Sequence, residues 1–490
     1  MLFNSFEFLL FLPIVFQLYW FVFKSLKWQN LLVVLASYVF YGWWNWKFLI
    51  LIAITTLCSF VSGVLIDKAP LPASPRGGEH GHRKKFSAAW WVGCINIILN
   101  LGILGTYKYY DFFAKELAAL MGIDANGLVL NLILPVGISF YTFQALSYSI
   151  DVYRGKIAAT HDIVEFAAYI SFFPQLVAGP IERATNLLPQ FQKSRYFDYT
   201  LAADGMRQML WGFFKKLIVG DNCAEVANWA FETYHTDNIG GLMMFIGAVA
   251  FTFQIYGDFS GYSDIAIGAA KLFGIKLRRN FNLPYFSRDV AEFWKRWHIS
   301  LNSWFVDYIY IPLGGSREGQ WKTIRNTFVI FLVSGLWHGA NWSFVAWGAY
   351  HAMLFVPLIL LGKQKRFGKS TVAENTILPT FTELYQMVGT FILAVFGWII
   401  FRAENITQAW DYILTMFQTA TVKYPLGEKI TMFYYIAILL GVEWFARKQS
   451  HPFAYIPIKW RFVRLCFYAI FFMWIISNRG NQVEFIYFQF

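Results

Sequence analysis

Long apolar runs separated by short polar segments dominate this 490-residue chain. A membrane-spanning helix needs about 20 mostly apolar residues. Ten runs meet or approach that length, and they centre on residues 5–23, 31–44, 48–66, 89–107, 240–256, 325–345, 346–362, 380–401, 430–446 and 462–478. Shorter or mixed runs lie near residues 131–150, 163–178, 205–220 and 300–313. The pattern predicts an all-α polytopic membrane protein with about 10–12 transmembrane helices.

The shorter runs are the places where we expect a functional site. Irregular backbone at membrane depth is tolerated only where protein or a water-filled cavity surrounds it. We therefore expect some of these segments to be re-entrant or interfacial helices. No long linker, repeat or low-complexity stretch divides the chain, so residues 1–490 are expected to form a single membrane-embedded domain.

Composition and charge agree with a membrane protein. Hydrophobic residues make up 57% of the chain and charged residues only 14%, whereas about 25% is usual in soluble proteins. The net charge is +12, and the basic residues are scattered between apolar runs. Basic residues distributed in this way are typical of cytoplasmic loops and lipid headgroup contacts. A net positive charge would also suit a phosphate-bearing donor. Nucleic acid is not expected as a partner, because the basic residues do not cluster. The four cysteines have no metal-binding spacing, so we expect no metal site.

The stretch Ser287–Arg317, SRDVAEFWKRWHISLNSWFVDYIYIPLGGSR, is the richest in chemically active side chains. Apolar residues recur every three or four positions from Arg288 to Trp304, which predicts one helix. Trp294, His298 and Asn302 would share one face of that helix. Two interpretations stay open: an interfacial helix with snorkelling Lys and Arg side chains, or a functional site.

A second histidine, His338, lies in the middle of the apolar stretch FVIFLVSGLWHGANWSFVAWGAYHAMLF. Its neighbours Gly335, Gly339 and Ala340 are small, and small residues allow helices to approach closely. A histidine at this depth either makes a buried hydrogen bond or transfers protons as a general base near pH 7. His351 lacks the cluster of small neighbours and is interpreted as structural.

Two aspartates, Asp258 and Asp264, lie six positions apart in the sequence YGDFSGYSDIAIGAAK. Further ligands at metal-binding spacing are not evident around them. We therefore expect both carboxylates to form ion pairs with Lys271, Arg278 or Arg279.

Five motifs together carry a resemblance to a known family: FWKRWHISLNSWFVDYIYIPLGGSR, SGLWHGANWSFVAWGAYH, LPVGISFYTFQALSYSIDVYRG, FFPQLVAGPIER and YGDFSGYSDIAIGAAKLFGI. They closely resemble the membrane-bound O-acyltransferases, especially the bacterial alginate O-acetylation branch and its D-alanyl-transfer relatives. The resemblance implies a helical bundle around a central funnel. It also implies transfer of an acyl group, acetyl in this branch, from a cytoplasmic thioester towards an acceptor outside the membrane. The donor would be acetyl-coenzyme A or an acyl-carrier thioester, with no tightly bound cofactor.

The resemblance also implies roles for single residues. His338 takes the place of the family's defining catalytic histidine and would act as general base on an attacking hydroxyl. His298 takes the place of its second catalytic position and would orient or polarise the thioester carbonyl or stabilise its oxyanion. The cations expected to bind donor phosphates are Lys295, Arg296 and Arg317. The residues expected to support the site are Trp294, Asn302, Asp307 and Trp337.

The chain ends in the aromatic sequence FIYFQF, residues 485–490. From composition alone this tail is an interfacial anchor. However, Phe485, Tyr487 and Phe490 match the F-x-Y-x-x-F ending of a short separate membrane peptide in the D-alanyl-transfer systems. This match implies a relay in which Tyr487, deprotonated by His338, accepts the acyl group first.

The resemblance extends to partners and location. It implies an exported polysaccharide as final acceptor, a separate extracytoplasmic partner of the SGNH or AlgJ/AlgX type, and a multi-pass protein of the bacterial cytoplasmic (inner) membrane in contact with lipid. Acyl transfer of D-alanine or another group to a cell-wall or lipid acceptor is an alternative. Functions of other classes are a polysaccharide or lipid transporter, for which we find no repeat, and a non-catalytic secretion scaffold.

Overall fold

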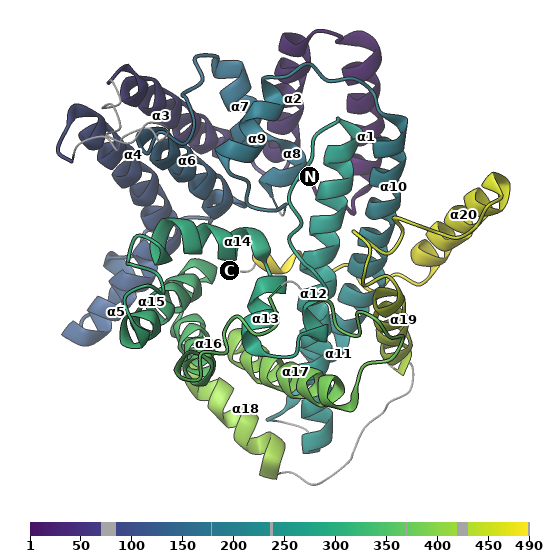
Figure 1. Cartoon of the computed structure of the whole chain (residues 1–490). Helices are drawn as coiled ribbons and strands as arrows, with labels where there is room; N and C mark the ends of the chain where they lie inside the picture. Colours follow the sequence, from purple (N-terminus) through teal and green to yellow (C-terminus); the bar gives the residue numbers. More distant parts are fainter. Residues whose placement is uncertain (70–84, 178, 236–238, 369, 419–429, 489–490) are drawn as a thin grey trace. The chain divides into compact units, whose positions relative to one another are not determined.

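The computed structural model describes residues 1–490 except 70–84, 178, 236–238, 369, 419–429 and 489–490. Across the described residues the regular secondary structure is helical, as Figure 1 shows. The backbone forms two compact units. Unit 1 comprises residues 1–205 and 266–278, and unit 2 comprises residues 206–265 and 279–490. Each unit is described by itself, and a single domain over residues 1–490 stays a prediction.

Unit 1 contains the first part of the chain. Its helices are α1 (Phe6–Gln17), α2 (Leu26–Gly42), α3 (Leu49–Lys68), α4 (Ala88–Leu104), α5 (Tyr110–Met121), α6 (Ile138–Tyr153), α7 (Ile163–Ser171), α8 (Phe173–Leu176) and α9 (Ala184–Phe191). Helices α3, α4 and α6 pack against one another, and α2 packs against α7 and α8 (Figure 1). Residues of α10 (Tyr199–Phe213) and α12 (Gly241–Leu272) belong to both units.

Unit 2 contains both histidine motifs. Its elements are the π-helical turn η5 (Phe214–Gly220), α11 (Asp221–Thr233), α13 (Val290–Arg296), α14 (Ile299–Phe305), the π-helical turn η7 (Val306–Tyr310), α15 (Gln320–His338), α16 (Trp342–Leu360), α17 (Phe381–Arg402), α18 (Ile406–Gln418), α19 (Thr431–Phe445) and α20 (Arg461–Ser477). A short helical turn, η9 (Ile486–Phe488), follows in the C-terminal tail.

Helices α15 and α16 pack closely because glycines line their contact. A Cβ on Gly335 would lie 2.9 Å from the carbonyl carbon of Phe344, and one on Gly348 would lie 2.9 Å from the carbonyl carbon of Phe331. Asn341 caps α16, its side chain accepting a 2.9 Å hydrogen bond from the Ser343 N–H. Helix α17 packs on α16, so the three helices lie side by side (Figure 1). The close helix approach predicted around Gly335 is confirmed.

Several helices are suited to crossing a membrane. Among the described residues, five are long and apolar enough: Trp46–Lys68, Ala88–Met121, Gly241–Leu272, Trp342–Leu360 and Phe381–Arg402. Two shorter apolar helices are Phe6–Val22 and Thr431–Phe445. Each of the ten predicted apolar runs overlaps a helix, although the run 325–345 covers the end of α15 and the start of α16. The all-α polytopic fold is confirmed. The number of long apolar helices is smaller than the predicted count because runs such as 31–44 and 462–478 form helices of only 17 residues.

Candidate active site

His298 lies at a break between two helices. A single helix was expected from Arg288 to Trp304, but α13 ends at Arg296 and α14 begins at Ile299. Trp297 is extended, and His298 has φ 46° and ψ 52°, in the left-handed region. That conformation costs of the order of 1–3 kcal/mol for a residue other than glycine and is concentrated at functional sites. The predicted continuous face through His298 is therefore wrong.

The break has a physical cause that helical periodicity does not reveal. The Asn302 amide nitrogen donates 2.7 Å hydrogen bonds to the carbonyl oxygens of Trp294 and Trp297, which the break leaves without helical partners. The Ile299 N–H donates to the carbonyl oxygen of Asn280 at 2.9 Å. These tertiary hydrogen bonds compensate for the lost helical ones, and they give the predicted residue Asn302 a structural role in presenting His298.

The His298 ring is buried and held by Asn280. Its Nδ1 lies 3.1 Å from Asn280 Oδ1. The same oxygen accepts hydrogen bonds from the Ser300 N–H at 3.3 Å and the Ser300 hydroxyl at 2.9 Å. A backbone N–H can only donate, so this amide atom is the oxygen, and the proton of the His298 ring lies on Nδ1. Nε2 therefore carries the lone pair, and it has no hydrogen-bond partner among the described residues.

Electrostatics keep His298 neutral. Burial, followed by repulsion from a charge on His338, lowers the pKa of His298 well below its ordinary value. The two histidines are thus coupled, because a proton on one disfavours a proton on the other. The pair is suited to carrying one proton at a time.

His338 is oriented by the main chain of its own helix. Its Nδ1 lies 2.6 Å from the carbonyl oxygen of Ser334, so Nδ1 donates and Nε2 carries the lone pair. The imidazole is buried, with ring centroids of Trp337 and Trp347 each 4.9 Å away and that of Phe401 5.5 Å away. In its neutral form, an imidazole oriented in this way is suited to act as a general base.

The C-terminal tail brings Tyr487 to both histidines. The Tyr487 ring centroid lies 5.9 Å from that of His338 and 6.2 Å from that of His298. It also packs on Phe259 at 4.5 Å. The neighbouring Phe485 is fully buried. The tail therefore lies inside unit 2, and all three residues predicted to be catalytic lie together. The third aromatic residue of the predicted motif, at position 490, is outside the described residues.

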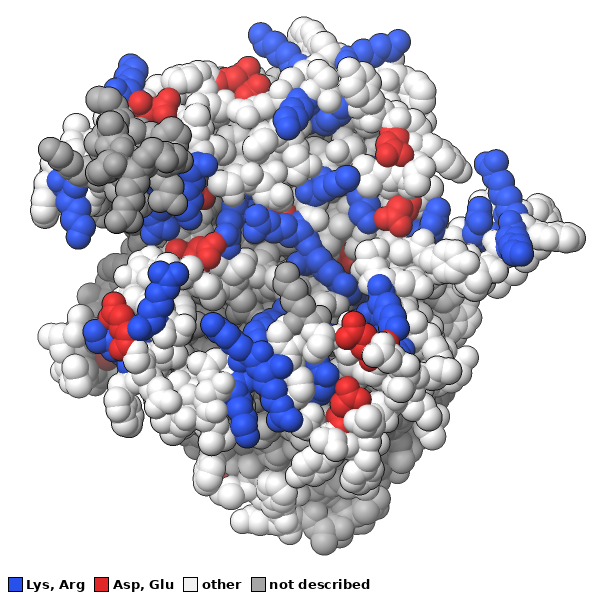
Figure 2. All heavy atoms as spheres, viewed as in Figure 1, with Lys and Arg blue, Asp and Glu red and all other residues white. Residues whose placement is uncertain are grey.

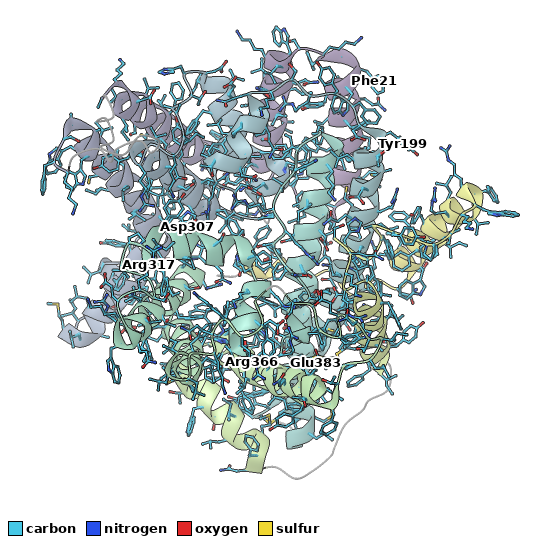
Figure 3. The ribbon with its side chains drawn as sticks, viewed as in Figure 1. Phe21, Tyr199, Asp307, Arg317, Arg366 and Glu383 are labelled. Atoms are coloured by element: carbon cyan, nitrogen blue, oxygen red, sulfur yellow. The ribbon has the colours of Figure 1, made fainter. Side chains whose placement is uncertain are left out.

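The predicted donor-binding cations are divided between two places. Lys295 donates to the carbonyl oxygen of Gln364 at 3.1 Å, and Arg296 forms a 2.7 Å ion pair with Glu292. Basic side chains gather on the face drawn in Figure 2, at the place where Figure 3 labels Arg366. Arg317 lies away from Arg366 in Figure 3. The structure thus brings Lys295 and Arg296 to one segment and leaves Arg317 apart from them.

The remaining predicted supporting residues differ in their distance from the reacting groups. The Trp337 ring contacts both histidines, with centroids 5.9 Å from His298 and 4.9 Å from His338. Trp294 donates from Nε1 to Nδ1 of His351 at 3.3 Å, which gives His351 a structural role. Asp307 is half-buried in η7, near Arg317 in Figure 3.

The ion pairs of the two aspartates differ from those predicted. Asp258 pairs with Lys216 at 2.7 Å, and Asp264 pairs with Lys215 at 2.5 Å. Both lysines come from η5, whereas the predicted Lys271 pairs with Asp204 and the predicted Arg278 with Glu182. The predicted partners are therefore wrong. Asn280 was missed altogether, because a lone asparagine after two arginines has no sequence signal for its contact with the catalytic ring.

Comparisons with known proteins agree with this geometry. The sequence profile of the membrane-bound O-acyltransferase family matches residues 156–397, which include both histidines. The chain is 39% identical over 425 residues to the probable alginate O-acetylase AlgI of Pseudomonas aeruginosa, covering 86% of this chain and 76% of that protein. It is 32% identical over 412 residues to the peptidoglycan O-acetyltransferase of Helicobacter pylori, covering 79% and 73%. The teichoic acid D-alanyltransferase of Bacillus subtilis is 29% identical over 299 residues, covering 56% and 70%. The chain therefore belongs to the membrane-bound O-acyltransferase family and is an acyltransferase.

Proposed function

We propose that this acyltransferase passes an acetyl group from a cytoplasmic thioester to Tyr487, and from there towards an exported polysaccharide. The observation that carries the proposal is the position of the Tyr487 ring, 5.9 Å and 6.2 Å by centroid from the rings of His338 and His298. The acetyl group is favoured because relatives from Pseudomonas aeruginosa and Helicobacter pylori are named as O-acetylating enzymes.

In the first step, Nε2 of His338 takes the proton of the Tyr487 hydroxyl. The phenolate oxygen attacks the thioester carbonyl, an ester bond forms, the carbon–sulfur bond breaks, and the thiolate takes the proton back from His338. A base is needed because burial raises the pKa of Tyr487 well above its ordinary value. Free phenolate is therefore costly in this site, and proton transfer must accompany the attack.

His298 supports this step as a hydrogen-bond acceptor. Its neutral ring has its proton on Nδ1, held by Asn280, so Nε2 has no proton with which to polarise a carbonyl. The role expected from the family resemblance, stabilising an oxyanion, would require the imidazolium. We propose instead that Nε2 of His298 accepts a hydrogen bond from the departing thiol.

The donor would be held by basic side chains near Lys295. Lys295 contacts the segment that carries the exposed residues Lys363, Lys365 and Arg366. Phosphate groups of coenzyme A or of a carrier's phosphopantetheine are the anions that such a group would bind. Arg296 already neutralises Glu292, so we assign it a smaller part.

In the second step a hydroxyl of an extracytoplasmic partner of the esterase type attacks the Tyr487 ester. A new ester forms on the partner, the bond to the Tyr487 oxygen breaks, and the proton of the attacking hydroxyl passes to the released phenolate. The partner would then modify the polysaccharide. A phenol ester is a good donor, because phenol has a pKa of about 10 and leaves more readily than an alkoxide. This route places the protein in the bacterial inner membrane, with the thioester on the cytoplasmic side.

The test uses the purified full chain and radiolabelled acetyl-coenzyme A, with peptide mass spectrometry to locate the label. Label is expected on Tyr487 and is expected to disappear in His338→Ala. Tyr262→Phe is a matched control, because it removes a buried phenol that packs on Phe485 at 4.4 Å. Full transfer to an acceptor by Tyr487→Phe would refute the relay. Label from a D-alanyl thioester but not from an acetyl thioester would refute the acetyl assignment.

A further inference from the structure

The last described residues of the chain are bound along η5, α11 and α12. The Gly480 N–H donates to the carbonyl oxygen of Leu217 at 3.0 Å, and the Asn481 side chain donates to Glu225 at 2.7 Å. A Cβ on Gly480 would lie 2.7 Å from the backbone nitrogen of Asn222. The tail therefore follows these helices at backbone contact distance.

A buried group of charges lies under this tail. Lys216 forms 2.7 Å ion pairs with Asp221 and with Asp258, and the three side chains are only 1%, 1% and 4% exposed. One ammonium group thus faces two carboxylates. The desolvation of such a group costs several kcal/mol per ion. A protein with apolar side chains of similar volume at these positions would often be no less stable. The packing of α12 on η5 alone therefore does not account for these charges.

Two of the three charged groups contact the main chain of the tail, and the third holds one of them. Lys216 donates to the carbonyl oxygen of Val483 at 3.0 Å, and Asp221 holds the Lys216 ammonium group through their 2.7 Å ion pair. Asp258 accepts a 2.7 Å hydrogen bond from the Ile486 N–H. Because the contacts are to backbone groups at two fixed positions, they set which residue of the tail lies where.

The contact at Asp258 adjoins the candidate catalytic residues on both of the segments that it joins. Asp258 precedes Phe259, whose ring lies 4.7 Å from that of His298. Ile486 precedes Tyr487, whose ring lies 4.5 Å from that of Phe259. The hydrogen bond between residues 258 and 486 therefore fixes Tyr487 against the residue that also packs on His298.

We propose that Lys216, Asp221 and Asp258 form a clasp that binds the tail and positions Tyr487 between the two histidines. This inference rests on the proposed function of Tyr487 as first acyl acceptor. The three are positioning residues, because they act through the tail and not on the acyl group.

The test compares three variants of the full chain in detergent. Lys216→Met removes the ammonium group that both carboxylates share. Asp258→Asn keeps the shape, but Lys216 and the Ile486 N–H contact different oxygens of the carboxylate, and the amide has an acceptor at only one of these two positions. Asp264→Asn is the control, because it takes a carboxylate from the neighbouring buried Lys215 with no tail contact among the described hydrogen bonds and ion pairs.

Two readouts are needed. Hydrogen exchange followed by mass spectrometry measures tail binding, and the rate of Tyr487 acetylation measures positioning. In Lys216→Met and Asp258→Asn we expect exchange of tail amides to rise by about tenfold or more and the acetylation rate to fall by about as much, the usual effect of losing a charge-assisted hydrogen bond. The KM for the donor should stay within about twofold, because the donor site is intact. Asp264→Asn should leave both unchanged.

The outcomes separate this proposal from the proposed function. If Lys216→Met does not fold, Asp258→Asn gives the same test with a smaller change of shape. The clasp would be overturned if Lys216→Met and Asp258→Asn both had the same tail exchange rate and the same Tyr487 acetylation rate as the Asp264→Asn control. Tail release in both variants, with Tyr487→Phe fully active, would leave the clasp standing as a tail-binding site and refute the relay that it was inferred to serve.

Discussion

The contact with Asn280 fixes the ring proton of His298 on Nδ1 and leaves the lone pair on Nε2. Replacing Asn280 tests this assignment. In Asn280→Leu the Nδ1 proton of the buried ring loses its acceptor. A buried donor without a partner costs about 1–3 kcal/mol, and the ring relieves that cost by turning or by moving its proton to Nε2. Either change removes the lone pair from the site. If the whole cost falls on the transition state, the acyl transfer rate decreases by about 5- to 150-fold.

Asn280→Asp gives an independent prediction from the same geometry. An aspartate keeps an acceptor on Nδ1, 3.1 Å away in the present structure, but adds a negative charge. Two unit charges about 4 Å apart attract by about 4 kcal/mol at an effective dielectric constant near 20, which corresponds to about 3 pKa units. The charge therefore raises the pKa of His298, which burial now holds low. The pH below which activity is lost should therefore lie higher in Asn280→Asp than in the wild type.

The assay is single-turnover transfer of labelled acetyl groups between pH 6 and 9 (a range chosen to bracket an ordinary histidine pKa of about 6.5). Ser263→Ala is the control, because it removes the acceptor of the Asn280 amide N–H without touching His298. Its rate should stay within about threefold of the wild type. An unchanged rate in Asn280→Leu, together with an unshifted pH profile in Asn280→Asp, would refute the assignment of the ring proton to Nδ1.

Three further predictions concern packing and charge. Gly335→Ala should destabilise the protein by about 1–3 kcal/mol, because its Cβ would lie 2.9 Å from a backbone carbon of α16. Thermal unfolding in detergent measures this loss. Gly389→Ala is the matched neutral control, because its Cβ meets nothing within 4 Å. Gly480→Ala should release the tail, since its Cβ would lie 2.7 Å from a backbone nitrogen of α11. Hydrogen exchange of the tail amides should therefore become faster than in the wild type, and an unchanged exchange rate would contradict this. Burial raises the pKa of Asp221 to about 7, despite the opposing effect of Lys216. Compared with the unfolded chain, folding therefore makes ionisation of Asp221 harder, and stability from this group is lost as the pH rises from about 4 to 7. In Asp221→Asn the difference between the unfolding midpoints at pH 5.5 and pH 8 should shrink.

The helices, and the residues that meet at the candidate site, were predictable from the sequence. Apolar runs of helical length locate each predicted helix because membrane insertion depends on local composition. His338 was identifiable because a histidine is expensive inside an apolar run. Tyr487 was identifiable only through the resemblance of the tail to a known motif, since its composition alone predicts an anchor.

The orientation of these residues was not predictable, because it depends on contacts between distant segments. The break at His298 is stabilised by Asn280, 18 positions earlier, and by the side chain of Asn302. The hydrogen bond between Asp258 and the Ile486 N–H joins residues 228 positions apart. Local periodicity contains no information on either contact, so it predicted a continuous helix and assigned the aspartates to the wrong cations.

The two histidines hold their protons in different ways, and this difference has a genetic consequence. His338 donates to the carbonyl oxygen of Ser334, a main-chain atom that every amino acid at position 334 supplies. His298 donates to a side-chain oxygen, which most substitutions of Asn280 remove. In a saturation screen for loss of function, position 280 should therefore tolerate few replacements on account of this hydrogen bond. Position 334 should be limited only by the space that a helix interior allows. The orientation of His338 by a backbone atom is therefore robust to mutation, whereas the orientation of His298 depends on one side-chain amide.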